Sequence, residues 1–254
     1  MCDDICVFDY DGTLCGPKET SVSPEHIKLL RAMQSNFKLV LATGRPRQLV
    51  PEISGFHWDA AVYFNGQLCV TGNQLIHRQL LEDCEWRGFC RAAQRENVEY
   101  MAFSDRIISP GPLVQLPCLP EVTGTSYKIG WPMNEPFLYK LIAEPSELVQ
   151  RLVERHMPNA QIVKWHPGFW EIVPAGVDKV AGVERVLSHM DWRWDRVITF
   201  GDGRNDCSLF RKASCSVAIG DRCPELVRMA TYAAPGIEQK GLEWAIMKIM
   251  SNED

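Results

Sequence analysis

The feature of this sequence that most constrains its fold is a series of short, mainly apolar runs separated by stretches with helical spacing. Residues 5–8, 37–42 and 60–64 are the first three runs. Runs of this length are typical of strands, and a continuous apolar run is typical of a strand buried on both faces of a parallel sheet. Between the first two runs, Ser23-Pro24 predicts a helix start, with apolar residues following at helical spacing.

The same alternation returns near residue 179. Residues 197–200 and 216–219 are two further apolar runs, and residues 241–250 predict a closing helix. We therefore predict one α/β domain with a parallel sheet, built from residues 1–80 and 176–254. An arrangement of this kind is tolerated when a second module is inserted into a surface loop of the first.

Residues 81–175 break this rhythm and predict an inserted α+β domain. The part from residue 109 to residue 136 is rich in proline, which argues against a long helix there. The remaining pattern predicts helices at residues 81–96 and 146–155 and strands at residues 137–143, 160–164 and 169–173. A helix followed by paired strands indicates a layer of helices on an antiparallel sheet.

The composition excludes several classes of function. The chain has 254 residues and a net charge of −5, whereas nucleic-acid-binding domains usually carry a basic excess. No apolar run approaches the roughly 18 residues that cross a bilayer, and the acidic N-terminus lacks the pattern of a signal peptide. The ten cysteines include no Cys-x-x-Cys pair, which disfavours a structural zinc protein. We therefore expect a cytoplasmic protein with reduced thiols and with neither a nucleic-acid partner nor a membrane association.

Two acidic residues directly after the first apolar run form the first candidate catalytic pair. Asp9 and Asp11 flank Tyr10 and precede Gly12, at the end of a strand where ligands bind in open α/β sheets. One carboxylate can attack phosphorus to give an aspartyl phosphate. The other can give a proton to the leaving group and later take one from water.

Two further clusters carry groups that suit a phosphate. Thr43-Gly44 follows the second apolar run, and Pro46 predicts that a helix begins directly after it. A hydroxyl and free backbone N–H groups at a helix start would hold a phosphate. Lys179, near another predicted helix start, supplies a cation that can offset phosphate charge in the transition state.

The fourth cluster, residues 201–206, follows a later apolar run and contains Asp202, Asn205 and Asp206. Mg²⁺ prefers oxygen ligands and usually takes one or two protein carboxylates. Asp9 and Asp202 can supply these carboxylates, together with the backbone carbonyl of Asp11. The sequence therefore predicts a magnesium site where the first and fourth clusters meet.

Each cluster alone has an ordinary structural explanation. Asp-x-Asp-Gly and Gly-Asp-Gly-x-Asn-Asp are common in polar turns, Thr-Gly often ends a strand, and a single lysine is usually solvent-exposed. Here all four clusters occur in one chain, and three of them directly follow apolar strands. This joint occurrence favours the functional interpretation.

The four clusters resemble the motifs of the haloacid dehalogenase superfamily. Asp9-Tyr10-Asp11-Gly12-Thr13-Leu14 resembles its first motif, Thr43 in Ala-Thr-Gly-Arg its second, Lys179 its third and residues 201–206 its fourth. Three more stretches resemble Cof-type phosphatases: Phe64-Asn65-Gly66, Trp170-Glu171-Ile172-Val173-Pro174 and Val217-Ala218-Ile219-Gly220. The resemblance implies a Rossmann-like core, residues 1–80 and 176–254, and a type IIB specificity cap at residues 81–175.

The resemblance also implies a role for each matching residue. Asp9 would be the nucleophile and a magnesium ligand. Asp11 would be the general acid/base and would give its backbone carbonyl to the metal. Asp202 would complete the metal site, supported by Asp206. The residues that would hold the phosphate are Thr43, Gly44, Lys179 and Asn205. A second aspartate at the position of Asp11 goes with phosphate transfer rather than dehalogenation in this superfamily.

The implied function is that of a magnesium-dependent phosphatase acting on small phosphorylated metabolites, with sugar phosphates first and phosphorylated cofactors next. A cap over the site would exclude water and select the leaving group. Candidate cap contacts, each of which also has an ordinary packing or surface explanation, are Asp105, Arg106, Lys128, Trp165 and His166. Two alternatives remain: a phosphosugar mutase, and a non-catalytic sensor of a phosphometabolite. A sensor has no need of a nucleophile, so the complete set of acidic residues speaks against it.

Overall fold

The computed structural model describes residues 4–16, 19–109, 127–166 and 168–251, and the chain divides into two compact units. The core unit comprises Met1–Arg78 and Asp178–Asp254, and the inserted unit comprises Gln79–Val177. The sequence predicted an inserted domain at residues 81–175. No helix within the described ranges has the length and apolar character needed to cross a bilayer.

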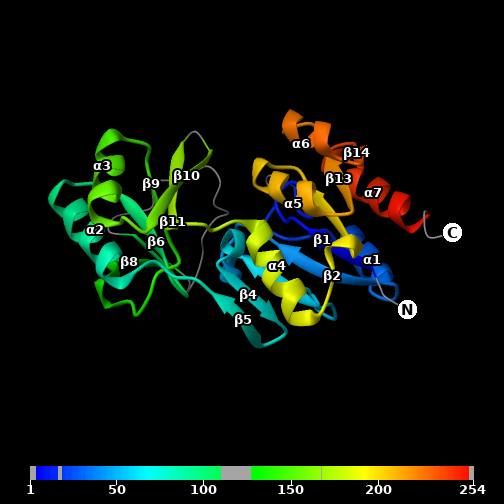
Figure 1. The fold of residues 1–254 in the computed structure, drawn as a ribbon, viewed down its shortest axis with the longest axis horizontal. Coiled ribbons are helices and arrows are strands. Elements are labelled where there is room, and N and C mark those ends of the chain that lie inside the picture. Colours follow the sequence, from blue (N-terminus) through cyan, green and yellow to red (C-terminus); the bar gives the residue numbers. More distant parts are fainter. Residues whose placement is uncertain (1–3, 17–18, 110–126, 167, 252–254) are drawn as a thin grey trace. The chain divides into compact units, whose positions relative to one another are not determined.

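An eight-stranded sheet forms the centre of the core unit (Figure 1). Its order is β14-β13-β12-β1-β2-β3-β4-β5, parallel from β14 to β3 and antiparallel from there to β5. The strands are β1 (Asp4–Phe8), β2 (Phe37–Ala42), β3 (Ala60–Tyr63), β4 (Leu68–Thr71), β5 (Gln74–Arg78), β12 (Val197–Gly201), β13 (Cys215–Ile219) and β14 (Tyr232–Ala234). The predicted α/β class is therefore confirmed.

Five α-helices accompany the parallel strands of the core unit among its described residues. They are α1 (Pro24–Met33), α4 (Lys179–Met190), α5 (Cys207–Lys212), α6 (Pro224–Met229) and α7 (Gly241–Met250), which follows the last strand. As predicted, Ser23 caps α1, because its side chain accepts a hydrogen bond from the His26 backbone. The apolar side of α4, with Val183 and Val186, packs in one buried cluster with Val7 of β1.

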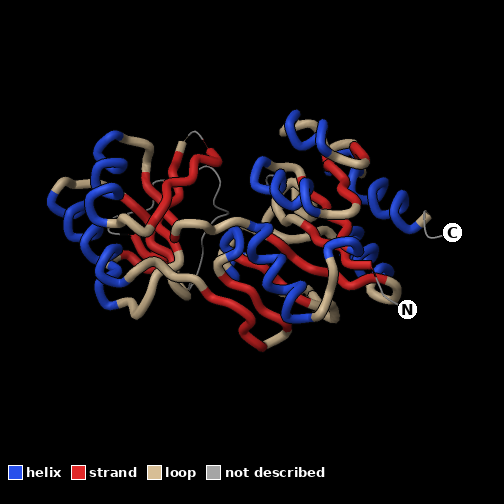
Figure 2. The backbone as a smooth tube through the Cα atoms, in the orientation of Figure 1, coloured by secondary structure: helices blue, strands red, loops and turns tan. Residues whose placement is uncertain are grey.

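The inserted unit has helices on one side of a six-stranded sheet, as the backbone trace in Figure 2 shows. Its helices are α2 (Asp83–Arg95) and α3 (Glu147–His156). The sheet order is β10-β11-β9-β6-β7-β8, and only the β7–β8 pair is parallel among the described strands. The strands are β6 (Tyr100–Phe103), β7 (Ile107–Ser109), β8 (Tyr127–Ile129), β9 (Lys140–Ala143), β10 (Ala160–His166) and β11 (Phe169–Pro174). This is the α+β layer that the sequence predicted.

The predicted helix after Pro46 is wrong. Only one 3₁₀ turn, Arg47–Leu49, follows, and Pro46 itself has the extended backbone angles φ −57° and ψ 146°. Pro51 supplies the reason, because a proline disfavours the helical conformation of the residue before it and cannot donate a backbone hydrogen bond. The two prolines leave room for a single turn.

The predicted strand over residues 137–143 begins later, at Lys140. The Leu138 carbonyl accepts a hydrogen bond from the Leu81 backbone at 2.9 Å, so this residue is paired with the entry of the inserted unit. Sequence patterns did not assign β6, β14, α5 or α6. Part of the predicted proline-rich segment, residues 110–126, lies outside the described residues.

Helix α4 packs against the 3₁₀ turn Phe64–Gly66 through two glycines. A Cβ atom on Gly182 would lie 2.6 Å from the Gly66 Cα atom and 2.6 Å from a Val62 methyl carbon. A Cβ on Gly66 would lie 2.3 Å from the Asp178 carbonyl oxygen. The absence of both side chains therefore allows the start of α4 to approach the turn closely.

We expect Gly182→Ala to lower the free energy of unfolding by about 1–3 kcal/mol, because the added methyl group overpacks this contact. Gly88→Ala is the matched control, since Gly88 also lies within a helix but its added Cβ would be 3.5 Å from the nearest atom. Alanine is the better helix former, so the control should be neutral or stabilising. Urea unfolding measures both, and equal effects of the two substitutions would contradict the close packing.

Candidate active site

Asp9 and Asp202 lie side by side because β1 and β12 are parallel neighbours. Phe8 is in register with Phe200, and the Asp9 backbone donates a hydrogen bond to the Phe200 carbonyl at 3.0 Å. Asp9 follows the last residue of β1, and Asp202 follows the last residue of β12. Two sequence-distant carboxylates therefore project from the same edge of the sheet, where open α/β sheets bind ligands.

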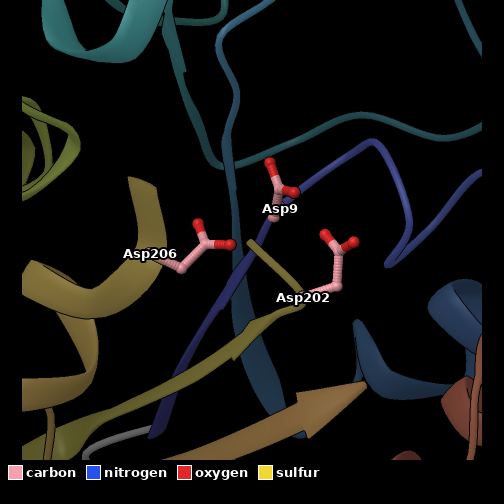
Figure 3. A group of neighbouring side chains, drawn as sticks. All are labelled: Asp9, Asp202 and Asp206. Atoms are coloured by element: carbon pink, nitrogen blue, oxygen red, sulfur yellow. The ribbon is translucent and has the colours of Figure 1, made fainter. Parts of the chain in front are cut away.

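Asp206 joins these two residues to form a cluster of three carboxylates (Figure 3). One oxygen atom from each of Asp9, Asp202 and Asp206 lies within 4.8 Å of the other two. Asp206 comes from the 3₁₀ turn Arg204–Asp206, and its Oδ2 atom accepts a hydrogen bond from the Gly203 backbone at 3.1 Å. Closely spaced carboxylate oxygens are the ligands that hard divalent cations prefer.

Lys179 is buried against this cluster at the start of α4. Its Nζ atom donates to Asp9 Oδ1 at 2.6 Å and to Asp206 Oδ1 at 2.7 Å, and only 1% of the residue is exposed. Burial by itself would lower the pKa of Lys179, but the charges of Asp206 and Asp9 outweigh it and raise that pKa. Lys179 is therefore a fixed positive charge in contact with Asp9.

One lysine does not neutralise three carboxylates. Burial, opposed by Lys179 and reinforced by the charges of Asp206 and Asp202, raises the pKa of Asp9 well above its ordinary value. Burial and then the charge of Asp206 raise the pKa of Asp202 to about 7. A divalent cation held by these oxygens would offset the excess negative charge and favour the ionised carboxylates. The residues present thus fit such an ion.

Gly12 allows the loop after β1 to turn directly over Asp202. Its φ angle is +81°, and a Cβ atom would lie only 2.1 Å from Asp202 Oδ2. A side chain there would be strained by the backbone and would also collide with the carboxylate. The glycine of the first motif is therefore required by the position of a residue in the fourth.

The carboxylate of Asp11 lies outside the group of three and pairs with Arg45. The Arg45 guanidinium donates to Asp11 Oδ1 at 2.6 Å through Nη2 and to Oδ2 at 2.9 Å through Nε. Arg45 is 8% exposed and stacks over the Tyr10 ring, with 4.4 Å between the guanidinium carbon and the ring centroid. The motifs predicted no role for Arg45, although this residue stands in the quoted Ala-Thr-Gly-Arg motif. That the Asp11 backbone carbonyl is a metal ligand stays a prediction.

Thr43 and Gly44 lie directly after β2, next to β1 in the sheet. Thr43 is fully buried, and its Oγ1 atom accepts a hydrogen bond from the Arg45 backbone at 3.0 Å. Because no α-helix begins here, the predicted cradle at a helix start is wrong.

Asn205 lies in the same 3₁₀ turn as Asp206, and its Nδ2 atom donates to Asn65 Oδ1 at 3.2 Å. The core unit therefore brings together residues from all four motifs. In the inserted unit, Asp105 and Arg106 lie exposed between β6 and β7, and Lys128 lies exposed in β8. The side chains of Trp165 and His166 are outside the described set.

A family model for haloacid dehalogenase-like hydrolases matches residues 6–111 and 121–246. The chain belongs to this family. YkrA of Bacillus subtilis (strain 168), which is provisionally named a phosphatase, is 24% identical over 95% of this chain and 96% of its own length.

Solved structures of this family share the fold. The haloacid dehalogenase subclass IIB sugar phosphatase BT4131 superposes with a TM-score of 0.76 and 22% identity, over 97% of this chain and 98% of its own. A haloacid dehalogenase-like hydrolase from Bacteroides thetaiotaomicron superposes with a TM-score of 0.81 and 21% identity, over 97% of this chain and 99% of its own. The predicted superfamily and its Cof-type phosphatase branch are thus supported by sequence and by structure.

We expect Lys179→Met to lower the free energy of unfolding by about 3–5 kcal/mol at pH 8 with a chelator present. The substitution leaves Asp9 and Asp206 buried without their counter-charge. Lys212→Met is the control, because Lys212 pairs with Glu184 at 2.8 Å on the surface. Removal of an exposed pair costs about 1 kcal/mol or less. Chemical unfolding that finds the two variants equally stable would contradict the importance of the buried pairs.

Proposed function

We propose that this member of the haloacid dehalogenase-like hydrolases is a magnesium-dependent phosphatase of small phosphorylated metabolites, with Asp9 as the covalent nucleophile. The observation that carries the proposal is the position of Asp9: its carboxylate is held by the buried Lys179 ammonium at 2.6 Å, inside a group of three carboxylates at the edge of the sheet. A nucleophile with a fixed cation beside it suits attack on a negatively charged phosphoryl group.

In the first step the Asp9 carboxylate attacks phosphorus, and the bond from phosphorus to the leaving oxygen breaks. Asp11 gives its proton to that oxygen, so the product leaves as an alcohol. In the second step Asp11 takes a proton from water while the water attacks the aspartyl phosphate. Inorganic phosphate and free Asp9 result. The Arg45 guanidinium, which holds the Asp11 carboxylate by two hydrogen bonds, would keep its orientation between these steps.

The phosphate-holding groups of the proposal are Lys179, Thr43, Gly44 and Asn205. A magnesium ion held by Asp9, Asp202 and the Asp11 carbonyl, with Asp206 nearby, would draw negative charge from the phosphoryl oxygens when bound. The oxygen-only donor set supports magnesium over softer metals, which prefer sulfur and nitrogen ligands.

We propose that the inserted unit is a cap that selects the leaving group. A cap of this kind favours small substrates. Sugar phosphates are the first candidates, because one protein of this fold is described as a subclass IIB sugar phosphatase. Phosphorylated cofactors come next. The test is inorganic phosphate release from a panel of both classes, with magnesium and with a chelator. No release from any compound by folded protein would contradict the phosphatase and favour a mutase or a sensor.

We expect Asp9→Asn to reduce phosphate release by about three orders of magnitude or more, because an amide is a poor nucleophile. The matched control is Asp191→Asn, an exposed acid at the end of α4 whose φ of 55° asparagine also tolerates. The control should keep full activity and the same melting temperature. Turnover near the unsubstituted level in Asp9→Asn would rule out Asp9 as the nucleophile.

We expect magnesium to raise the melting temperature of the unsubstituted protein, because an ion that binds only the folded state stabilises it. At a concentration about 100 times Kd the gain is about 2.7 kcal/mol. Asp202→Asn should lose most of this shift, whereas Asp191→Asn should keep it. Thermal scans with and without magnesium measure the effect, and an equal shift in Asp202→Asn would exclude Asp202 as a ligand.

A further inference from the structure

The turn Phe64–Gly66 is a strained and buried part of the core unit that has no role in the mechanism so far. Phe64 and Asn65 both have left-handed backbone angles, with φ values of 52° and 53°, and Gly66 has a φ of 109°. A left-handed conformation is a genuine outlier for a bulky residue such as phenylalanine. Such strain persists only where surrounding contacts enforce it, and it gathers at functional sites.

Asn65 contacts the segments of the second and fourth motifs at the same time. Its backbone donates to the Thr43 carbonyl at 2.9 Å, and its Oδ1 atom accepts from Asn205 Nδ2 at 3.2 Å. Its amide also fills the space beside Gly44, where a Cβ atom would lie 3.0 Å from Asn65 Nδ2. Asn65 is only 7% exposed, so these contacts are made in a buried environment.

The next residue of the same turn contacts the helix that carries Lys179. Gly66 touches the Asp178 carbonyl and the Gly182 backbone, as the close distances for an added Cβ atom indicate. Asp178 caps α4, and Lys179 is the first residue of that helix. One three-residue turn is therefore in contact with the segments that carry Thr43, Lys179 and Asn205.

We propose that Asn65 is a positioning residue of the phosphate site, which orients the Asn205 amide and holds it against the Thr43-Gly44 strand end. This inference rests on the proposed function of the site. The Asn205 amide has two N–H donors, and Asn65 takes one of them. The amide cannot flip without loss of this bond, so the direction of its second N–H is fixed, as donation to a phosphate oxygen requires.

The left-handed backbone of Asn65 offers a clean substitution. Asn65→Gly removes the amide, and glycine adopts a positive φ without strain, so the fold should be retained. We expect kcat/KM for a phosphorylated substrate to fall about 10- to 100-fold, in line with a displaced binding group. The Kd for orthovanadate or inorganic phosphate, measured by calorimetry with magnesium, should rise in parallel while the melting temperature changes little.

The double variant Asn65→Gly/Asn205→Ala separates a positioning role from a merely structural one. If Asn65 acts through Asn205, adding Asn65→Gly to a protein that already carries Asn205→Ala should change kcat/KM and phosphate affinity less than about twofold. Effects that multiply in the double variant would overturn the proposal, as would Asn65→Gly with unchanged phosphate affinity.

Asn97→Gly is the matched control, because Asn97 has a φ of 54° but lies exposed after α2 in the inserted unit. It should leave kcat/KM and phosphate affinity unchanged. If Asn65→Gly does not fold, Gly44→Ala replaces it, since its methyl group would press on the Asn65 amide. Because Gly44 is itself proposed to hold the phosphate, the substitution is also measured in the Asn205→Ala background. Unchanged phosphate affinity in folded Gly44→Ala, or an equal loss with and without Asn205, would overturn the proposal.

The two readouts also separate this inference from the proposed function. If the unsubstituted protein binds phosphate but releases none from any substrate, the phosphatase proposal fails and the positioning role is still decided by the affinities. If the unsubstituted protein turns over substrate and Asn65→Gly has the same kcat/KM and the same phosphate affinity, only the positioning role fails. If it neither binds phosphate nor turns over substrate, both fail.

Discussion

The interaction on which the site depends is the contact of the buried Lys179 ammonium with Asp9 and Asp206. In the chain, Lys179 is separated from Asp9 by 170 positions and from Asp206 by 27 positions. A buried charge without a partner is costly, so these three segments must meet when the core unit folds. The ends of β1 and β12 and the start of α4 are thereby held at one edge of the sheet, and the same residues that satisfy one another's charge form the proposed catalytic site.

Close approach of backbones makes this meeting sterically feasible. Gly12 leaves room for the Asp202 carboxylate, and a Cβ atom on Gly201 would lie 2.6 Å from the Asp206 carboxyl carbon. Gly66 and Gly182 allow α4 to contact the turn after β3. Gly12 and Gly201 directly adjoin Asp11 and Asp202, and Gly182 lies one turn after Lys179 in α4. Packing and chemistry therefore constrain the same positions.

Local sequence patterns predicted the elements that depend on local physics. The apolar run of β2 and the closing helix α7 have the predicted bounds, and Ser23 caps α1 as expected. The prediction failed after Pro46, where the second proline, Pro51, limits the helix to one turn. It also missed the short strand β6, since four residues carry too little periodicity to be distinguished from a loop.

The sequence by itself determined the α/β class and which acidic residues, lysine and asparagine are candidates for the site, because apolar strands and the motifs that follow them can be read along the chain. Only the tertiary structure decided which of them touch. It joined Asp9, Asp202 and Asp206 in one group, tied Asp11 to Arg45, and set Asn65 beside Asn205. These contacts depend on which strands are neighbours in the sheet, and neighbour choice follows from packing over the whole core unit rather than from any single segment.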